Sequence, residues 1–280
     1  MIKEINRDIF ILSQKSEPAT ENDRQTGEDL LETLIANSER CVGMAANMIG
    51  VSKNIIAIND NNKMMTGELF DINGEEFKIV SLDGHRISIR KIQLKNSYSP
   101  KKVVVPGKTL NEVSKILPGD ADSDVTISFT EKHIVFEFDK TVVVSRLIEG
   151  EYFKIDQMLS SDYETKVRVN KKEFLSCIDR ATLLVKEGDK KPIIVNITDS
   201  GMELKINSAL GSMNEEIDIQ KQGKDLMIGF NPKFLIDALR VIDDEEVDLY
   251  MVNPKAPCFI KNAEESYIYL ILPVNFTTVA

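Results

Sequence analysis

Residues 101–117, KKVVVPGKTLNEVSKIL, decide the fold, because they open a structural unit that the chain uses three times. A short apolar strand runs directly into a short helix, and three more strands follow in VTISFT, HIVFEFD and TVVVSRL. The second copy opens with TKVRVNKKEFLSCIDRATLLV and the third with DLMIGFNPKFLIDALRVI. A repeat of about fifty residues is one supersecondary unit stacked on itself. The sequence therefore predicts an α+β fold of repeated strand–helix–three-strand units.

The helix of each copy carries its own signals. Apolar residues recur at helical spacing and predict the face that packs on a sheet. Asn170 and Asn231 are expected helix caps, and Pro232 suits a first helical position. The predicted apolar faces consist of Leu110, Val113 and Leu117, then Phe174, Ile178 and Ala181, and finally Leu235, Ala238, Leu239 and Ile242.

The composition is that of a globular protein. The chain has 280 residues, of which 42% are hydrophobic and 29% charged, so about two domains are expected. No apolar run approaches the roughly 20 residues that span a bilayer, and the start MIKEINRDIF is too charged for a signal peptide. Cys41, Cys177 and Cys258 are widely spaced, which indicates reduced thiols. We expect a cytoplasmic protein with no membrane partner, cofactor or metal.

The distribution of charge is uneven. A net charge of -10 argues against a typical nucleic-acid binder, which is basic overall. However, acidic runs lie in the loops at 119–124 and 243–246, whereas the repeat helices carry basic residues off their apolar faces. This arrangement indicates a surface for phosphates, and ordinary solvated side chains are the alternative. The predicted DNA-binding residues are Lys108, Lys115, Lys172, Arg180, Lys233 and Arg240.

Several stretches carry a family resemblance. They are MMTGELFDI at 64–72, VSLDGHRISI at 80–89, VVVPGKTLNEVSKIL at 103–117, SRLIEGEYF at 145–153 and YLILPVNF at 269–276. With these stretches the chain resembles the bacterial sliding clamp, the beta subunit of DNA polymerase III. The resemblance implies a DNA-replication processivity factor that is not an enzyme. In that family two three-domain subunits form a ring around double-stranded DNA, with helices facing the duplex.

The resemblance also implies a groove that captures short peptides of the replicative polymerase, the clamp loader and repair proteins. An apolar groove with few polar groups suits such varied ligands. Several family members have Pro and Arg where this chain has Phe153 and Gln157. The residues that match the groove are Met65, Leu82, Gly84, His85, Arg86, Ile87, Phe153, Gln157, Met158, Pro257, Leu270, Leu272, Pro273 and Val274.

The first sixty residues resemble a different family. The stretch 41–50, CVGMAANMIG, is similar to the GxGLAAxQIG loop of peptide deformylase. Cys41 replaces the first glycine, and Met48 replaces the active-site glutamine, whose hydrogen bond methionine cannot donate. The metal site of that family needs a cysteine and an HExxH helix, but this chain has two histidines far apart, His85 and His133. We therefore predict no catalytic residue and an inactive segment.

These resemblances divide the chain into three parts. Residues 1–60 form a deformylase-like fragment, 61–150 an incomplete middle clamp domain, and 151–280 a linker and C-terminal clamp domain. The middle domain lacks one strand and one helix. We consider the hypothesis that a helix at 27–40, with an apolar face at Leu30, Leu31, Leu34 and Ile35, takes the vacant helix position. The segment NIIAI at 54–58 would then supply an edge strand.

Three functional hypotheses remain open. In the first hypothesis, the chain is a truncated sliding clamp that binds partner peptides and, weakly, DNA. Alternatively it is a deformylase-like metallohydrolase, or a chimera without function. Bound metal would favour the second, and binding of a clamp-motif peptide would separate the first from the third.

Overall fold

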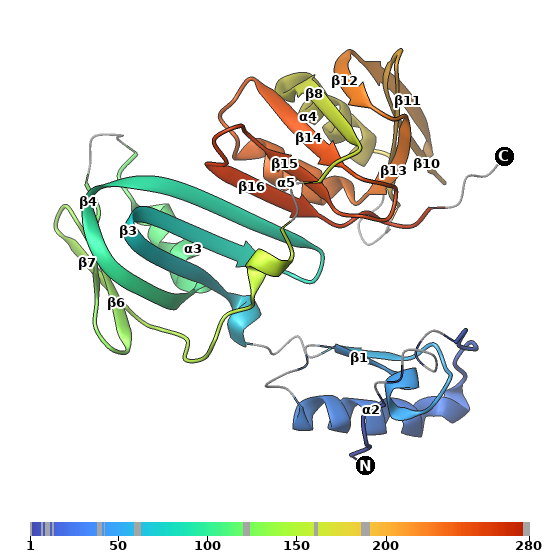
Figure 1. Ribbon diagram of the computed structural model, residues 1–280, viewed down its shortest axis with the longest axis horizontal. Helices are drawn as coiled ribbons and strands as arrows, with labels where there is room; N and C mark the ends of the chain where they lie inside the picture. The colour runs from blue at the N-terminus through green and yellow to red at the C-terminus, as the bar shows by residue number, and fades with distance from the viewer. Residues whose placement is uncertain are drawn as a thin grey trace. The chain divides into compact units, whose positions relative to one another are not determined.

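The computed structural model describes residues 2–6, 8, 12, 14–37, 41, 43–58, 63–119, 124–159, 162–185 and 191–276. They belong to two compact units, Met1–Thr66 and Gly67–Ala280 (Figure 1). The predicted junction at 58–62 lies largely outside the described residues, as do the acidic residues 120–123 and the terminal residues 277–280.

The first unit is a small α+β layer. Its core consists of Leu30, Leu34, Met44 and Ala46, supplied by one helix and the segment that follows it. Gly50 has a φ of 81°, a left-handed conformation that closes a 3-10 turn and favours glycine. The elements are η1 (Glu21–Asp23), α2 (Arg24–Ala36), β1 (Gly43–Ala45), η2 (Ala46–Ile49), β2 (Ile56–Ile58) and η3 (Lys63–Thr66).

The hypothesis that 54–58 extends the clamp sheet is wrong. Strand β2 pairs with β1 in an antiparallel two-stranded sheet, with Ala57 opposite Met44. Helix α2 buries Leu30 and Leu34 in the core of this same unit, while Leu31 and Ile35 are exposed. The helix therefore uses its apolar face locally, because the loop at 43–58 offers an apolar surface close by in the chain.

The second unit begins with a long bent hairpin. Strand β3 (Gly67–Leu82) pairs with β4 (Arg86–Pro106). Seven residues of straight strand span about 23 Å, yet the rings of Phe70 and Phe77 lie 5.1 Å apart. Strand β3 therefore bends back on itself, and β4 follows the outside of the bend. Gly74, with a φ of 62°, provides the left-handed residue at the register shift.

The remainder of the middle domain is one helix and one sheet. Helix α3 (Gly107–Ile116) is followed by β5 (Thr126–Phe129), β6 (His133–Phe138) and β7 (Thr141–Arg146), which form a three-stranded antiparallel sheet in the order β5-β6-β7. Phe70 and Phe77 from the hairpin, Val113 from α3 and Phe136 from β6 share one core.

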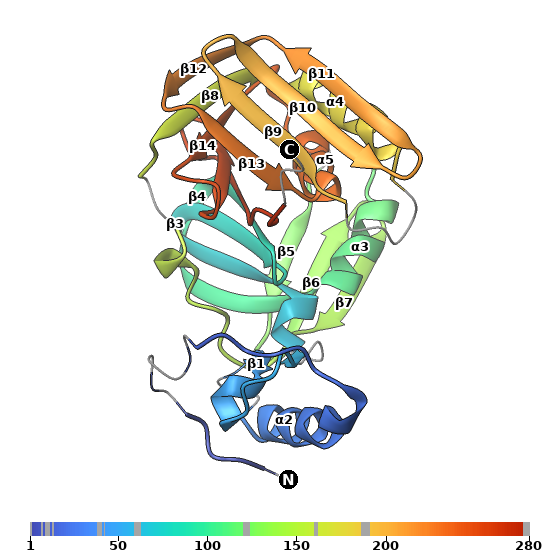
Figure 2. The ribbon, with the colours of Figure 1, turned by 90° about the vertical axis from the view of Figure 1, so that its right-hand side faces the viewer.

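The C-terminal domain contains two helices between two sheets (Figure 2). One sheet has the order β11-β10-β9-β13. The other has seven strands in the order β12-β8-β14-β15-β16-β4-β3, and its last two strands belong to the middle domain. The elements are η4 (Ile155–Gln157), β8 (Thr165–Asn170), α4 (Lys171–Thr182), β9 (Ile193–Thr198), β10 (Gly201–Ser208), β11 (Gly211–Ile217), β12 (Ile219–Gly223), β13 (Leu226–Phe230), α5 (Pro232–Arg240), β14 (Glu246–Met251), β15 (Cys258–Lys261) and β16 (Tyr267–Ile271).

Each of the three copies contains a strand, a helix and three strands, and the mixed α+β prediction is confirmed. The amides of Glu173 and Lys233 donate to the side chains of Asn170 and Asn231, so both predicted caps are present. The predicted apolar faces of α4 and α5 are buried. On α3 only Val113 is fully buried; Leu110 is half-buried, and Leu117 follows the helix end in an extended conformation and is exposed.

Candidate partner-peptide site

The two clamp-like domains meet at a strand pair. Strand β16 runs antiparallel to the first residues of β4, so that Ile87 lies opposite Leu270. Beyond the strand, the Leu272 amide donates to the carbonyl oxygen of His85 at 2.9 Å. This pairing brings the β3–β4 turn beside the terminal segment, although about 180 residues separate them in the chain. Ile87 and Leu270 are each 5% exposed, so they are buried below the turn and the terminal segment.

The turn between β3 and β4 is held by Asp83. Its carboxylate accepts the amides of His85 at 2.8 Å and Arg86 at 3.1 Å, and the Arg86 guanidinium at 2.8 Å. Burial acts to raise the pKa of Asp83, but these donors more than offset it, and the pKa lies below its ordinary value. The carboxylate therefore stays charged and keeps the turn closed. Gly84 and His85 are exposed at its tip.

Arg86 connects this turn to helix α5. Its guanidinium bonds Asp237 at 2.6 Å and lies 4.6 Å from the centre of the Phe234 ring. The His85 ring lies 5.9 Å from the same ring. Sequence reasoning missed Phe234 and Asp237. The available signal was an aromatic residue on α5 outside the predicted apolar face, half-buried in the structure.

The terminal segment completes the surface. Leu272 is 36% exposed, and Pro273 and Val274 are half-buried. The Val274 amide donates to the Gly229 carbonyl at 2.8 Å. A side chain at Gly229 would come within 2.6 Å of the Phe276 ring, so glycine allows the close approach of this segment to β13. We call His85, Arg86, Phe234 and Leu272–Val274 the junction surface.

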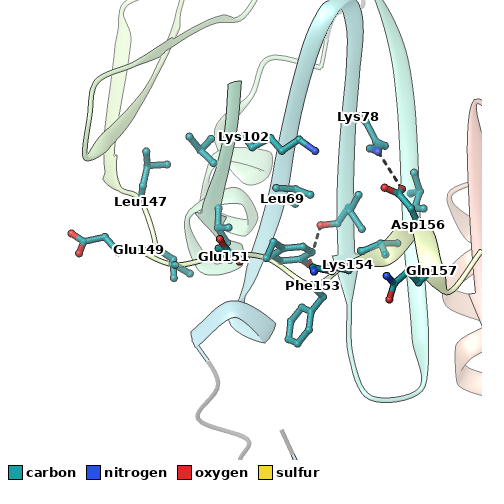
Figure 3. A pocket seen from close by; sticks show the side chains of 18 of the residues that line it. Leu69, Lys78, Lys102, Leu147, Glu149, Glu151, Phe153, Lys154, Asp156 and Gln157 are labelled. Atoms are coloured by element: carbon teal, nitrogen blue, oxygen red, sulfur yellow. Dashed lines mark hydrogen bonds and ion pairs between the residues drawn. The ribbon is translucent and has the colours of Figure 1, made fainter. Parts of the chain in front are cut away.

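The predicted linker residues lie in a second feature, a cavity of about 680 Å³ between the linker and the β3–β4 hairpin (Figure 3). Phe153 and Gln157 line it, together with Leu69 and Lys78. The Tyr152 hydroxyl donates to the Val80 carbonyl at 3.2 Å and tethers the linker to β3. Burial, with a smaller effect of Glu68, raises the pKa of Tyr152, so the hydroxyl remains a donor.

The remaining predicted groove residues are Met65, Met158, Pro257 and Leu82. Met65 is half-buried in η3, which belongs to the first unit. Met158 is exposed after η4, and Pro257 is half-buried just before β15. Leu82 is half-buried at the end of β3.

The predicted DNA-binding residues fall into two groups. Lys108, Lys172 and Lys233 are exposed in the first turns of α3, α4 and α5, and form no ion pair with any described residue. The other three are paired within the chain. Arg180 bonds Glu215, Arg240 bonds Asp179 at 3.1 Å, and Lys115 bonds Glu112 at 2.8 Å. These three cations are therefore exposed, but each already has an acidic partner within the chain.

The deformylase-like loop forms β1 and η2, and Met48 packs against the core of the first unit. His85 and His133 lie on the β3–β4 turn and at the start of β6. In the part of the chain that the structure describes, no three His, Cys, Asp or Glu side chains cluster closely enough to hold a metal ion. Nor does any described helix have the length and apolar character needed to cross a membrane.

Three family models match the sequence. Residues 45–154 match the central domain of the DNA polymerase III beta subunit, and residues 156–275 match its C-terminal domain. Residues 2–79 match the polypeptide deformylase model. The clamp and deformylase matches overlap between residues 45 and 79, around the predicted junction.

Individual relatives agree with the clamp matches. The beta sliding clamps of Staphylococcus aureus and Staphylococcus epidermidis are 32% identical over 237 residues, which cover 84% of this chain and 63% of theirs. A Eubacterium rectale protein solved as a DNA polymerase III beta subunit is 76% identical, with a TM-score of 0.76, and the match covers 78% of this chain and 60% of that one.

The sliding clamp of Bacillus subtilis is 34% identical with a TM-score of 0.72, over 78% of this chain and 58% of that one. The chain thus spans less than two thirds of the length of these relatives. It contains the central and C-terminal domains of the DNA polymerase III beta subunit family, preceded by a segment that matches polypeptide deformylase.

Proposed function

We propose that this chain is a truncated sliding clamp that binds short linear peptides at the junction surface. In this reading residues 1–60 are the deformylase-like fragment, 61–150 the incomplete middle domain, and 151–280 the linker and C-terminal domain. The observation that carries the proposal is the β4–β16 pair, which brings His85 beside Leu272. Both walls of the surface come from segments that match the clamp family models.

The side chains of the junction surface suit a peptide ligand. Leu272, Pro273 and Val274 offer apolar contacts, and the Phe234 ring and Arg86 offer an aromatic face and a cation. Burying one apolar anchor is worth about 1.5–3 kcal/mol. Ordering the peptide offsets much of this gain, so an affinity in the micromolar range, about 8 kcal/mol, is expected. The partners in this proposal are the replicative polymerase, the clamp loader and repair proteins.

A fluorescence titration with a labelled clamp-binding peptide tests the proposal. Leu272→Asp places a charge on the junction surface and should weaken binding at least tenfold. Leu210→Asp is the matched control, because Leu210 is an exposed leucine in the β10–β11 turn. Equal binding by wild type and Leu272→Asp, or no binding by a folded wild type, would favour the chimera without function.

Weak DNA binding is a second proposal, favoured by Lys108, Lys172 and Lys233, which form no ion pair with a described residue. Each stands in the first turn of a helix, where the backbone dipole also attracts phosphate. Non-specific affinities lie around 10⁻⁴–10⁻⁶ M and fall steeply with salt. Replacing all three lysines by glutamine should abolish the binding. Replacing the ion-paired Lys115, Arg180 and Arg240 should reduce it less, and an affinity independent of salt would contradict the proposal.

We also propose that the deformylase-like segment is inactive. Met48 stands at the position of the family's glutamine, and donates no hydrogen bond to a developing oxyanion. Metal analysis of the purified protein distinguishes the alternatives, because a stoichiometric bound metal would restore the metallohydrolase hypothesis.

A further inference from the structure

The middle domain has an open sheet edge where the C-terminal domain has a filled one. In the C-terminal domain, β14 lies between β15 and β8. Strand β5 is the corresponding first strand after helix α3, yet it has β6 on one side and no partner strand on the other among the described residues. Helix α5 packs against α4, whereas α3 is the one described helix of its domain. Among the described residues of the Gly67–Ala280 unit, the middle domain therefore has no counterpart of β8 and α4.

Residues at matching positions differ in exposure. Val125 lies just before β5, and the matching residue of the C-terminal domain is Val247, near the start of β14. Val125 is 38% exposed, whereas Val247 is 1% exposed. Leu117 follows α3, and the matching residue after α5 is Ile242. Leu117 is 38% exposed, whereas Ile242 is 1% exposed. The same kind of apolar side chain is therefore buried where the strand–helix pair is present and exposed where it is missing.

A cavity of about 820 Å³ lies at this edge. Its apolar lining comes from the β3–β4 hairpin and from the β5 segment, and includes Ile72, Phe77, Leu94, Ile127 and Phe129. Polar residues, among them Lys95, Lys101 and Asp124, also line it. All five apolar residues belong to, or pack against, the core of the middle domain. The apolar part of the cavity is thus continuous with the core and suits apolar side chains, while its polar part suits a partner that keeps one face in water.

The free edge of β5 also offers backbone hydrogen bonds. Thr130 donates its amide to the His133 carbonyl at 2.9 Å, so this pair bonds across the β5–β6 ladder. Bonded and non-bonded pairs alternate in an antiparallel ladder. The amides of Phe129, Ile127 and Val125 therefore point away from β6, toward the open side. A partner strand could pair with them without disturbing β6.

The charge of Lys115 indicates which kind of residue the partner helix would carry. In the C-terminal domain, Arg240 of α5 bonds Asp179 of α4 at 3.1 Å. Lys115 is the residue of α3 that matches Arg240, since both lie eight residues after the first residue of their helix. Lys115 is exposed, and its ion-pair partner among the described residues is Glu112 of its own helix. An acidic residue in the third turn of a docked helix would find a cation at this point.

We propose that this edge binds a strand–helix segment of a partner polypeptide. Its strand pairs with Val125–Phe129 and alternates apolar and polar residues. Its helix follows directly, fills the cavity with one apolar face, and carries an acidic residue opposite Lys115. The proposal concerns a different surface from the junction surface and does not depend on it.

A labelled synthetic peptide with the sequence of residues 165–182 is the probe, because this segment fills the corresponding position in the C-terminal domain. Fluorescence anisotropy with the full chain should show micromolar binding.

Val125→Pro removes an outward amide but no bond to β6, and should weaken binding at least tenfold. Val125→Thr is the control that keeps the amide, and its affinity should match that of wild type. Lys115→Glu should weaken binding a few-fold, and an Asp179→Lys peptide should restore it.

Hydrogen exchange gives a readout that does not depend on a variant folding. Slower exchange at Ile127 and Phe129 on adding the peptide supports the proposal. No binding by the wild-type chain, or binding that Val125→Pro leaves unchanged, overturns it. Protection of these amides before any peptide is added would show that the chain fills the edge itself. A dimer that Val125→Pro dissociates would show that a second copy fills it. Either result also overturns the proposal.

Discussion

Asp248 is a buried carboxylate of the C-terminal domain with several cationic donors around it. It lies on β14, and its carboxylate accepts two hydrogen bonds from the Arg168 guanidinium, at 2.7 and 2.9 Å. It also forms an ion pair with Lys166 at 2.9 Å. Both cations come from β8, so the carboxylate ties these neighbouring strands together. Burial acts to raise the pKa of Asp248, but the donors outweigh it and lower the pKa.

A lowered pKa in the folded state links this residue to acid stability. The contribution of Asp248 is fully present above the ordinary aspartate pKa of about 4, and is lost as the pH falls through the lower folded value. Asp248→Asn should lower the free energy of unfolding by about 1–2 kcal/mol at pH 7, because Arg168 and Lys166 keep partial access to solvent. The same substitution should lower the free energy of unfolding less at pH 3. Urea denaturation at both pH values measures this, and an equal loss at both would contradict the link.

At the scale of one element, helix α4 begins at a cap that can be tested alone. The Asn170 side chain accepts the Glu173 amide at 3.0 Å. Asn170→Ala leaves that amide without its acceptor and should cost about 1 kcal/mol of stability. Asn170→Ser keeps a capping oxygen and should lose only a few tenths. Thermal unfolding of the two variants gives the comparison, and equal losses would mean that the side chain acts in some other way.

The repeat units could be predicted because their signals are local. Alternating apolar residues, a capping asparagine and a proline at the first helical position all act within a few residues of each helix or strand. Leu117 was misassigned because helix α3 ends at Ile116, and the chain then turns to an extended conformation. The helical spacing alone contains no information on that boundary.

Contacts between distant segments could not be predicted in the same way. The ion pair of Arg240 is an example, because its partner Asp179 lies on another helix, 61 residues earlier. Phe234 and Asp237 join the candidate site only because β16 pairs with β4 and brings α5 to the β3–β4 turn. The same limit explains the error on β2, since strand pairing depends on which partner folds nearby.

At the scale of the whole molecule, the two units differ in the size of their cores. The first unit buries Leu30, Leu34, Met44 and Ala46, whereas the C-terminal domain alone has a far larger buried cluster. Small cores give marginal stability, and local opening then precedes global unfolding. Amides of α2 should therefore exchange at least tenfold faster than those of β9. Hydrogen exchange read by mass spectrometry tests this, and a single exchange rate for both would show one cooperative structure.

The pairing of β16 with β4 also has a consequence for the order in which the chain is made. Strand β4 leaves the ribosome early, but its partner on this edge is nearly the last segment to be synthesised, about 180 residues later. At roughly 5–20 residues per second, the edge at Arg86–Arg90 waits unpaired for about ten seconds or more. During that time it is open to any other extended chain. The arginines and the lysine on this edge, Arg86, Arg90 and Lys91, are the kind of charged side chains that discourage such pairing. The nascent chain is thus protected by the same residue, Arg86, that later anchors the turn to α5.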